Sequence, residues 1–185
     1  DGSLHAKGLR LAVTAGDRDV LDRLVQLGLE LFGLSAQRDE RDAGYVAVQF
    51  NSVPLTMWWR ACGFEKQRPS ADHAGKGWTP HVPDAILHTN DRDVYAAFVR
   101  GLFEADGTVS AGYPSFSTVS ERFSRDVQSL LLTLGFVTTR KVDEAGSNWG
   151  THPRYVLRLL NVAAATRFAE QIGFISARKS GGLLL

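Results

Sequence analysis

The order of predicted secondary structure repeats within this chain, and that repeat is the strongest constraint on its fold. Alternating apolar and polar residues around a Lys7-Gly8 turn predict a β-hairpin near the start. A strongly amphipathic stretch follows, with Asp17 placed to cap its first turn. The predicted elements of this first half are a hairpin at 3–14, a helix at 18–32, strands near 35–40 and 44–50, and a helix at 53–61.

The second half shows the same order after a second Asp-Gly pair. Its predicted elements are a hairpin at 107–118, a helix capped by Ser120, strands near 136–142 and 154–160, and a helix from about 162. Asp106 lies 106 − 1 = 105 residues after Asp1, and Gly173 lies 173 − 63 = 110 residues after Gly63. If a helix precedes each Asp-Gly, both halves are αββαββα units. Two such units predict a pseudo-two-fold axis.

The repeat divides the chain into three parts. We expect a first half at 1–64, a linker at 65–90 and a second half at 91–185. The linker is rich in Pro, Gly, His and Lys, with one helical turn expected at 84–87. Neither end of the sequence looks like a natural terminus, so we expect the chain to be part of a longer protein.

Composition narrows the class of protein. The 185 residues include 44% apolar ones, which is typical of a globular domain. The apolar runs are too short for a membrane span, and no secretory signal opens the chain. The single cysteine excludes a disulfide framework and fits a reducing, cytoplasmic location. Since the formal net charge is +1, binding to nucleic acid would require a localised cluster of positive charge.

The helix before the second Asp-Gly has an unusual face. Ala97, Gly101 and Ala105 recur every four residues, which predicts a buried seam where another helix approaches closely. The partner expected is the helix that would end at Asp1, upstream in the parent protein; a second copy of the chain or a bare seam are the alternatives. A Gly101 that faces solvent with no helix across it would argue against the two-fold acid-pair model. Asp106 stands at the helix C-terminus, where the dipole disfavours an anion by about 0.3–1 kcal/mol. Either a bound cation compensates for this charge, or Asp106 only caps a turn with Gly107 in the left-handed conformation.

The stretch Phe98–Gly107, FVRGLFEADG, resembles the LAGLIDADG motif of homing endonucleases in its intein form. Asp1-Gly2 resembles the end of a first copy of that motif. The segment Ile172–Lys179, IGFISARK, is similar to the one that closes intein endonuclease domains. More loosely, the chain resembles endonuclease domains of inteins inserted in ribonucleotide reductases.

The resemblance implies an α+β fold with two pseudosymmetric αββαββα halves, whose antiparallel sheets form a DNA-binding saddle. It also implies catalysis with Mg²⁺ or Mn²⁺ at two adjacent sites, one for each DNA strand. The metal-binding positions that it implies are Asp1, Gly2, Ala105 and Asp106.

Family members also use a basic residue near each acid. Lys179 follows Asp106 by 179 − 106 = 73 residues, and Lys76 follows Asp1 by 76 − 1 = 75, so these two form the best-matched pair. The catalytic residues implied are therefore Asp1, Asp106, Lys179 and Lys76. The sequence departs from the intein pattern at Pro80, where a Lys is common, so Lys66 or His81 could take the place of Lys76.

Alternation along the strands assigns residues to the expected DNA-facing side of each sheet. In the first half these residues are Ser3, His5, Lys7, Arg10, Thr14, Arg38, Arg41, Tyr45 and Gln49. In the second half they are Thr108, Ser110, Tyr113, Ser115, Ser117, Arg140, Lys141, Arg154 and Arg158. One strand is ambiguous, because alignment of Asn51 with Asn161 puts Arg158 at the position of Val48, a core residue.

These observations predict a monomeric, site-specific endonuclease that cuts both strands of double-stranded DNA and is joined to the splicing domain of an intein. Two alternatives stay open. One is a relative that binds DNA or RNA without cleaving it, such as a maturase or a regulator. The other is an inert remnant of an intein.

Overall fold

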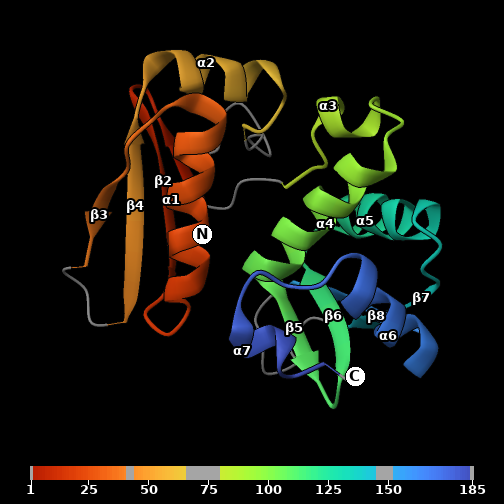
Figure 1. Cartoon of the computed structure of the whole chain (residues 1–185). Helices are drawn as coiled ribbons and strands as arrows, with labels where there is room; N and C mark the ends of the chain where they lie inside the picture. Colours follow the sequence, from red (N-terminus) through yellow and green to blue (C-terminus); the bar gives the residue numbers. More distant parts are fainter. Residues whose placement is uncertain (1, 41–43, 66–79, 145–151, 184–185) are drawn as a thin grey trace. The chain divides into compact units, whose positions relative to one another are not determined.

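The computed structural model describes residues 2–40, 44–65, 80–144 and 152–183. The chain forms two compact units, one comprising Asp1–Glu65 with Ile175–Arg178 and the other comprising Lys66–Phe174 with Lys179–Leu185. Each unit contains one four-stranded antiparallel sheet (Figure 1). No described helix is long and apolar enough to cross a membrane. The α+β class with two antiparallel sheets is confirmed.

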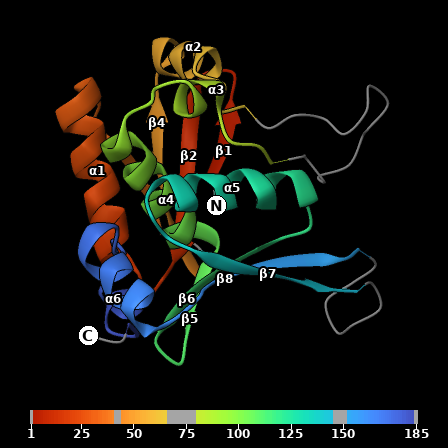
Figure 2. The same ribbon diagram turned by 90° about the vertical axis from the view of Figure 1, so that its right-hand side faces the viewer.

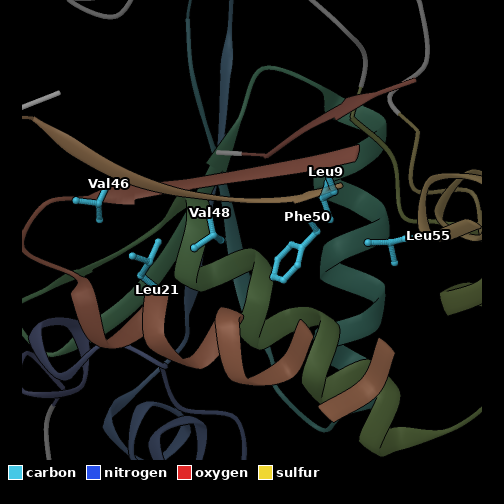
Figure 3. Packing of buried hydrophobic residues seen from close by; sticks show 6 residues of the cluster. All are labelled: Leu9, Leu21, Val46, Val48, Phe50 and Leu55. Atoms are coloured by element: carbon cyan, nitrogen blue, oxygen red, sulfur yellow. The ribbon is translucent and has the colours of Figure 1, made fainter. Parts of the chain in front are cut away.

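The first unit follows the predicted order closely. Its elements are β1 (Gly2–His5), β2 (Gly8–Thr14), α1 (Arg18–Phe32), β3 (Gln37–Asp39), β4 (Tyr45–Asn51) and α2 (Val53–Ala61). The strand order across the sheet is β1-β2-β4-β3, so β2 and β4 are the central strands and β1 and β3 are the edges. Both helices pack on the same side, since Leu21 of α1 and Leu55 of α2 share one core with β2 and β4 (Figure 3).

That core explains the predicted alternation. Leu9 of β2 packs with Val46, Val48 and Phe50 of β4, all on the helix side of the sheet. Gly28 lets α1 approach this layer, because a Cβ there would lie 2.1 Å from Cε1 of Phe50. A larger side chain would have to displace the ring.

Two expectations for α1 are wrong in detail. Asp17 precedes the helix but makes no side-chain capping bond, because its carboxylate accepts hydrogen bonds from Thr14 Oγ1 (2.9 Å) and from both Nε and Nη2 of Arg178 (2.8 and 2.7 Å). Leu31, whose helical spacing from Leu24 and Leu27 predicts it on the apolar side, is 66% exposed. The neighbouring Phe32 instead packs against Trp58 of α2, with ring centroids 5.4 Å apart.

The second unit repeats the plan with a long helix in front. Its elements are α3 (Asp84–Leu87), α4 (Arg92–Asp106), β5 (Gly107–Ser110), β6 (Tyr113–Thr118), α5 (Glu121–Thr133), β7 (Thr138–Asp143), β8 (Arg154–Leu159) and α6 (Val162–Gln171). The strand order is β5-β6-β8-β7, and Figure 2 shows β7 and β8 side by side. The short helix α7 (Ala177–Ser180) contains a boundary between the two units, because Arg178 belongs to the first unit and Lys179 to the second.

Local chemistry accounts for the helix boundaries in this unit. Asn90 and Asp91 both precede α4 and are residue types that cap helices; Asp91 is the one used, and its carboxylate accepts from the amides of Asp93 and Val94. Ser120 caps α5 as predicted, and Asn161 caps α6. These bonds satisfy amides that the first helical turn leaves without partners.

Aromatic side chains fill the core of the second unit. Phe103 of α4 lies 5.8 Å from Phe116 of β6 and 5.2 Å from Phe168 of α6, measured between ring centroids. All three rings are almost completely buried. The last turn of α4 is therefore anchored against the sheet, directly before Asp106.

Candidate functional site

The first sheet has a polar face opposite its helices. Ser3 pairs with Arg10, Arg10 with Gln49, and Gln49 with Gln37, so these side chains form one row across the four strands. Because side chains alternate along a strand, residues two positions away share this face. The outward placement of Ser3, His5, Arg10, Thr14, Tyr45 and Gln49 is confirmed. Lys7 lies in the exposed β1–β2 turn, and Arg41 lies outside the described residues.

The second sheet has an equivalent row. Thr108 pairs with Ser115, Ser115 with Arg158, and Arg158 with Thr139. The same face carries the remaining outward residues predicted from the sequence, namely Ser110, Tyr113, Ser117, Lys141 and Arg154. The ambiguity at the last strand is thereby resolved: Arg158 corresponds to Gln49, and Leu157 corresponds to Val48.

Two arginines expected on this face point the other way. Arg38 pairs across the strands with Val48, and Arg140 pairs with Leu157, so both lie on the helix side. There Arg38 bonds Asp22 of α1 (2.6 Å), and Arg140 lies 3.4 Å from Glu121 of α5. Arg125, followed by Arg140, lowers the pKa of Glu121 below its ordinary value. The prediction failed because side chains alternate along a strand: Arg140 cannot share a face with its neighbour Lys141, and Arg38 cannot share one with its neighbour Gln37.

Sequence reasoning also missed residues that lie on the polar faces. Gln37, Asn51 and Thr139 share the polar faces. In the first sheet, Gln49 Nε2 donates to Asn51 Oδ1 (2.7 Å), and Asn51 Nδ2 donates to Gln37 Oε1 (3.1 Å). Asn51 could have been found by continuing the alternation from Gln49, whereas Gln37 required the pairing of β3 with β4.

Carboxylates on these faces neutralise much of the local positive charge. Arg10 lies 3.7 Å from Asp39, while Lys141 and Arg154 share Asp143 at 2.8 and 2.6 Å. Hydrogen bonds from Lys141 and then Arg154 lower the pKa of Asp143 below its ordinary value. The positive charges of Lys141 and Arg154 on the second sheet are therefore partly neutralised by the Asp143 carboxylate.

Asp143→Asn should accordingly increase the affinity of the chain for DNA. The substitution removes the anion that competes with phosphate for Lys141 and Arg154, and it keeps the size of the side chain. We expect tighter binding to any duplex and a steeper loss of affinity with salt. Fluorescence anisotropy across a salt series measures both effects, with Asp93→Asn on α4 as a charge-matched control. Weaker binding by the Asp143 variant would contradict this view.

The C-terminus of α4 presents an exposed carboxylate. Asp106 is the last residue of the helix, and its side chain has no hydrogen-bond or ion-pair partner within the described ranges. Gly107 is extended, with φ −81°, so the left-handed turn considered above is not formed. A Cβ at Gly107 would lie 2.5 Å from the carbonyl oxygen of Phe103, so any larger residue would clash there. This steric limit is enough to account for the glycine.

Lys179 supplies the positive charge at this helix end. The residue is buried, and its Nζ donates to the carbonyl oxygens of Phe103 (3.0 Å), Gly107 (2.8 Å) and Glu104. An ammonium group has three N–H donors, and three carbonyl oxygens accept from this one. The spacing argument paired Lys179 with Asp106 as a catalytic residue, which stays a prediction; in the structure its Nζ caps the carbonyls at this end of α4.

The other half of the expected acid pair is not described. Asp1, Lys76 and Lys66 lie outside the described residues, while Gly2 opens β1 and His81 is half-buried. Elsewhere in the described chain no three His, Cys, Asp or Glu side chains gather as a metal site. The Asp106 carboxylate and the Ala105 carbonyl are oxygen donors of the type that Mg²⁺ accepts.

The small-residue seam is not buried. Ala97, Gly101 and Ala105 are exposed, and a Cβ on Gly101 would meet nothing within 4 Å. The reason is angular: α4 buries Tyr95, Val99 and Phe103, and a step of two residues turns a helix by about 200°. The helix expected to cover this seam would end at Asp1 and is not among the described residues, so a buried seam and a paired-acid site stay predictions.

The comparison with protein families identifies the second unit. Residues 93–173, which run from α4 to α6, match the model of the LAGLIDADG-like domain. This part of the chain is a LAGLIDADG-like domain. Its motif helix is α4, which ends at Asp106 with Gly107 following, as the resemblance implied.

Solved structures resemble nearly the whole chain in fold, and not only the residues that match the family model. The structure of I-DmoI in complex with DNA and Mn covers 94% of this chain and 87% of its own, with a TM-score of 0.60 and 13% identity. Full-length DUF199/WhiA from Thermatoga maritima covers 97% of this chain and 52% of its own, with a TM-score of 0.57 and 13% identity. The chain thus has the fold of LAGLIDADG homing endonucleases.

The curated relatives are enzymes whose printed names describe different activities. A glutamine–fructose-6-phosphate aminotransferase of Methanocaldococcus jannaschii is 25% identical over 88% of this chain and 14% of its own length. A DNA gyrase of Mycobacterium kansasii is 30% identical over 77% of this chain and 26% of its own. A DNA polymerase of Thermococcus hydrothermalis is 39% identical over 54% of this chain and 6% of its own. The chain therefore spans about a quarter or less of these proteins.

Proposed function

We propose that this chain is the endonuclease domain of an intein, and that it cleaves both strands of a specific double-stranded DNA site with Mg²⁺ or Mn²⁺. The observation that carries the proposal is the exposed Asp106 carboxylate at the end of α4, within the LAGLIDADG-like domain. The likeness to I-DmoI, solved with DNA and Mn, supports DNA and a divalent metal as its ligands.

The chemistry divides between the metal and the protein. A divalent ion held by carboxylates supplies an activated water and stabilises the leaving alkoxide. Asp106 and the Ala105 carbonyl would hold the ion on one side, with Asp1 and Gly2 as the matching positions of the first half. Lys179 holds the carbonyls of the last turn and so fixes the direction of the Asp106 backbone. A direct role for Lys179 in proton transfer would require it to release one of these carbonyls.

The intein context rests on the pattern of relatives. Matching segments occur in an aminotransferase, a DNA polymerase, a DNA gyrase and a replicative helicase, and in each they are a small part of the protein. Such recurrence in unrelated enzymes supports an inserted element with its own splicing domain. The ribonucleotide reductase host, the monomeric state and the cytoplasmic location remain predictions.

A second candidate is a domain that binds double-stranded DNA without cutting it. One observation favours it: the Lys179 ammonium donates to three carbonyl oxygens at the end of α4. Both candidates place DNA on the polar faces of the sheets. They differ only in whether a metal-dependent cut follows.

Binding to duplex DNA should depend strongly on salt despite the near-neutral net charge. If Lys7, Arg10, Lys141 and Arg154 contact phosphates, the slope of log affinity against log salt should be about −3 to −4. Affinity for a duplex of mixed sequence, measured from about 50 to 300 mM salt, gives this slope. A flat dependence would remove DNA as the ligand of these faces.

A further inference from the structure

The two sheets carry different side chains at one equivalent position. In the first sheet the row across the strands is Ser3, Arg10, Gln49 and Gln37, and in the second it is Thr108, Ser115, Arg158 and Thr139. Gln49 and Arg158 therefore occupy the same place on β4 and β8, the third strand of each sheet in spatial order. Both project from the polar face.

Arg158 is held in place without being neutralised. Its guanidinium carbon lies 4.7 Å from the centroid of the Tyr113 ring, which fixes the guanidinium against an aromatic face. Within the described residues Arg158 has no carboxylate partner, whereas Arg10, Lys141 and Arg154 on the same two faces are all ion-paired. Its N–H donors are thus available to a ligand.

The neighbours of Arg158 leave room for such a ligand. Ser115 and Thr139, directly opposite on the adjacent strands, are small, and the Ser115 hydroxyl is already bonded to that of Thr108 at 2.9 Å. Arg158 is therefore the one long donor of its row.

Gln49 is organised by amide groups instead. Its Nε2 donates to Asn51, which in turn donates to Gln37. Gly8, opposite Asn51, has no side chain to block this arrangement, since a Cβ there would lie 3.1 Å from Asn51 Oδ1. These bonds leave one carboxamide N–H and the Oε1 of Gln49 for a ligand.

We propose that Arg158 selects a guanine and Gln49 selects an adenine at corresponding positions of the two halves of the DNA target, which is therefore asymmetric. The inference rests on the proposed binding of duplex DNA. The guanidinium fork matches the O6 and N7 acceptors of guanine in the major groove, and a carboxamide matches the N6 donor and N7 acceptor of adenine. Tyr113 acts as a positioning residue for Arg158.

Reciprocal swaps test this assignment. The full chain is incubated with a pool of duplex DNA containing a randomised core, and the bound molecules are sequenced after several rounds. Arg158→Gln should convert one selected guanine to adenine, and Gln49→Arg should convert one selected adenine to guanine. Each change should alter the ratio of the two bases by about fivefold to 150-fold. Arg158→Lys keeps the charge but not the rigid guanidinium fork, so it should weaken the guanine preference and keep the affinity for mixed duplex.

Controls separate the possible failures. Arg122→Gln, which removes an exposed arginine from α5, should leave the selected sequence unchanged. Tyr113→Phe should keep the guanine preference, and Tyr113→Ala should weaken it. If the wild type selects a sequence that neither swap alters, the assignment of Gln49 and Arg158 is overturned while the proposed function stands. If the wild type retains no duplex from the pool, the proposed function fails as well.

Discussion

Asp106→Asn should abolish cleavage of a target duplex, lowering the rate by at least about a hundredfold, and leave binding nearly unchanged. The amide has almost the same volume as the carboxylate, and Asp106 is exposed, so little packing changes. What is lost is the negative charge that would hold the divalent ion and lower the pKa of the attacking water.

The measurement is the conversion of supercoiled plasmid carrying the selected site to nicked and linear forms with Mg²⁺. Asp93→Asn, at the other end of the same helix, controls for the loss of one negative charge from α4 and should cut at the wild-type rate. Cleavage by the Asp106 variant at the wild-type rate would refute its role as a metal ligand.

Lys179→Met should destabilise the second unit severely. Three carbonyl oxygens at the end of α4 would lose the Lys179 donor; that of Phe103 keeps the Gly107 amide, and each buried polar group left without a partner costs about 1–3 kcal/mol. The free energy of unfolding should fall by about 3 kcal/mol or more, because Met fills the space but donates no hydrogen bond. Urea unfolding followed by circular dichroism measures the change.

Two comparisons define the role of Lys179. Lys141→Met removes a lysine whose side chain is 78% exposed and should change the stability by less than about 0.5 kcal/mol. Lys179→Arg keeps the charge but not the geometry of the three bonds, so it should recover part of the stability. An unaltered unfolding free energy together with lost cleavage would contradict the cap and assign Lys179 to the chemistry directly.

The sequence predicted the elements of the fold because local signals and the repeat agree with each other. Alternation in β2 and β4 and the helix caps at Asp91 and Ser120 are local features, and all were located from the sequence. The order of strands in each sheet is not local, and it came only from the pairing of β2 with β4 and of β6 with β8.

The candidate site was less predictable because it depends on pairing and on long-range contacts. Arg38 and Arg140 were chosen for their charge, but the register of each edge strand turns them toward a helix. Gln37 was missed for the same reason. Lys179 was placed beside α4 by spacing alone, yet its role depends on three carbonyls, one of them 76 residues away in the chain.

Asp17 and Gly101 show two further limits. Asp17 is a residue type that commonly caps helices, but its carboxylate binds Arg178, which lies 161 residues away in the chain. No local rule predicts this contact. Gly101 suggested close helix packing, but the buried face of α4 was set by Tyr95, Val99 and Phe103. Small residues alone therefore did not identify the packed side of the helix.

The most direct test of the account is metal-dependent cleavage by the chain itself. The purified protein is incubated with a linear duplex carrying the selected site, in Mg²⁺ and in EDTA, and both labelled strands are resolved on a denaturing gel. The account predicts one defined cut in each strand with Mg²⁺ and none in EDTA. Tight, salt-dependent binding to the same duplex with both strands left intact in Mg²⁺ would contradict it, and would establish a DNA-binding domain without nuclease activity.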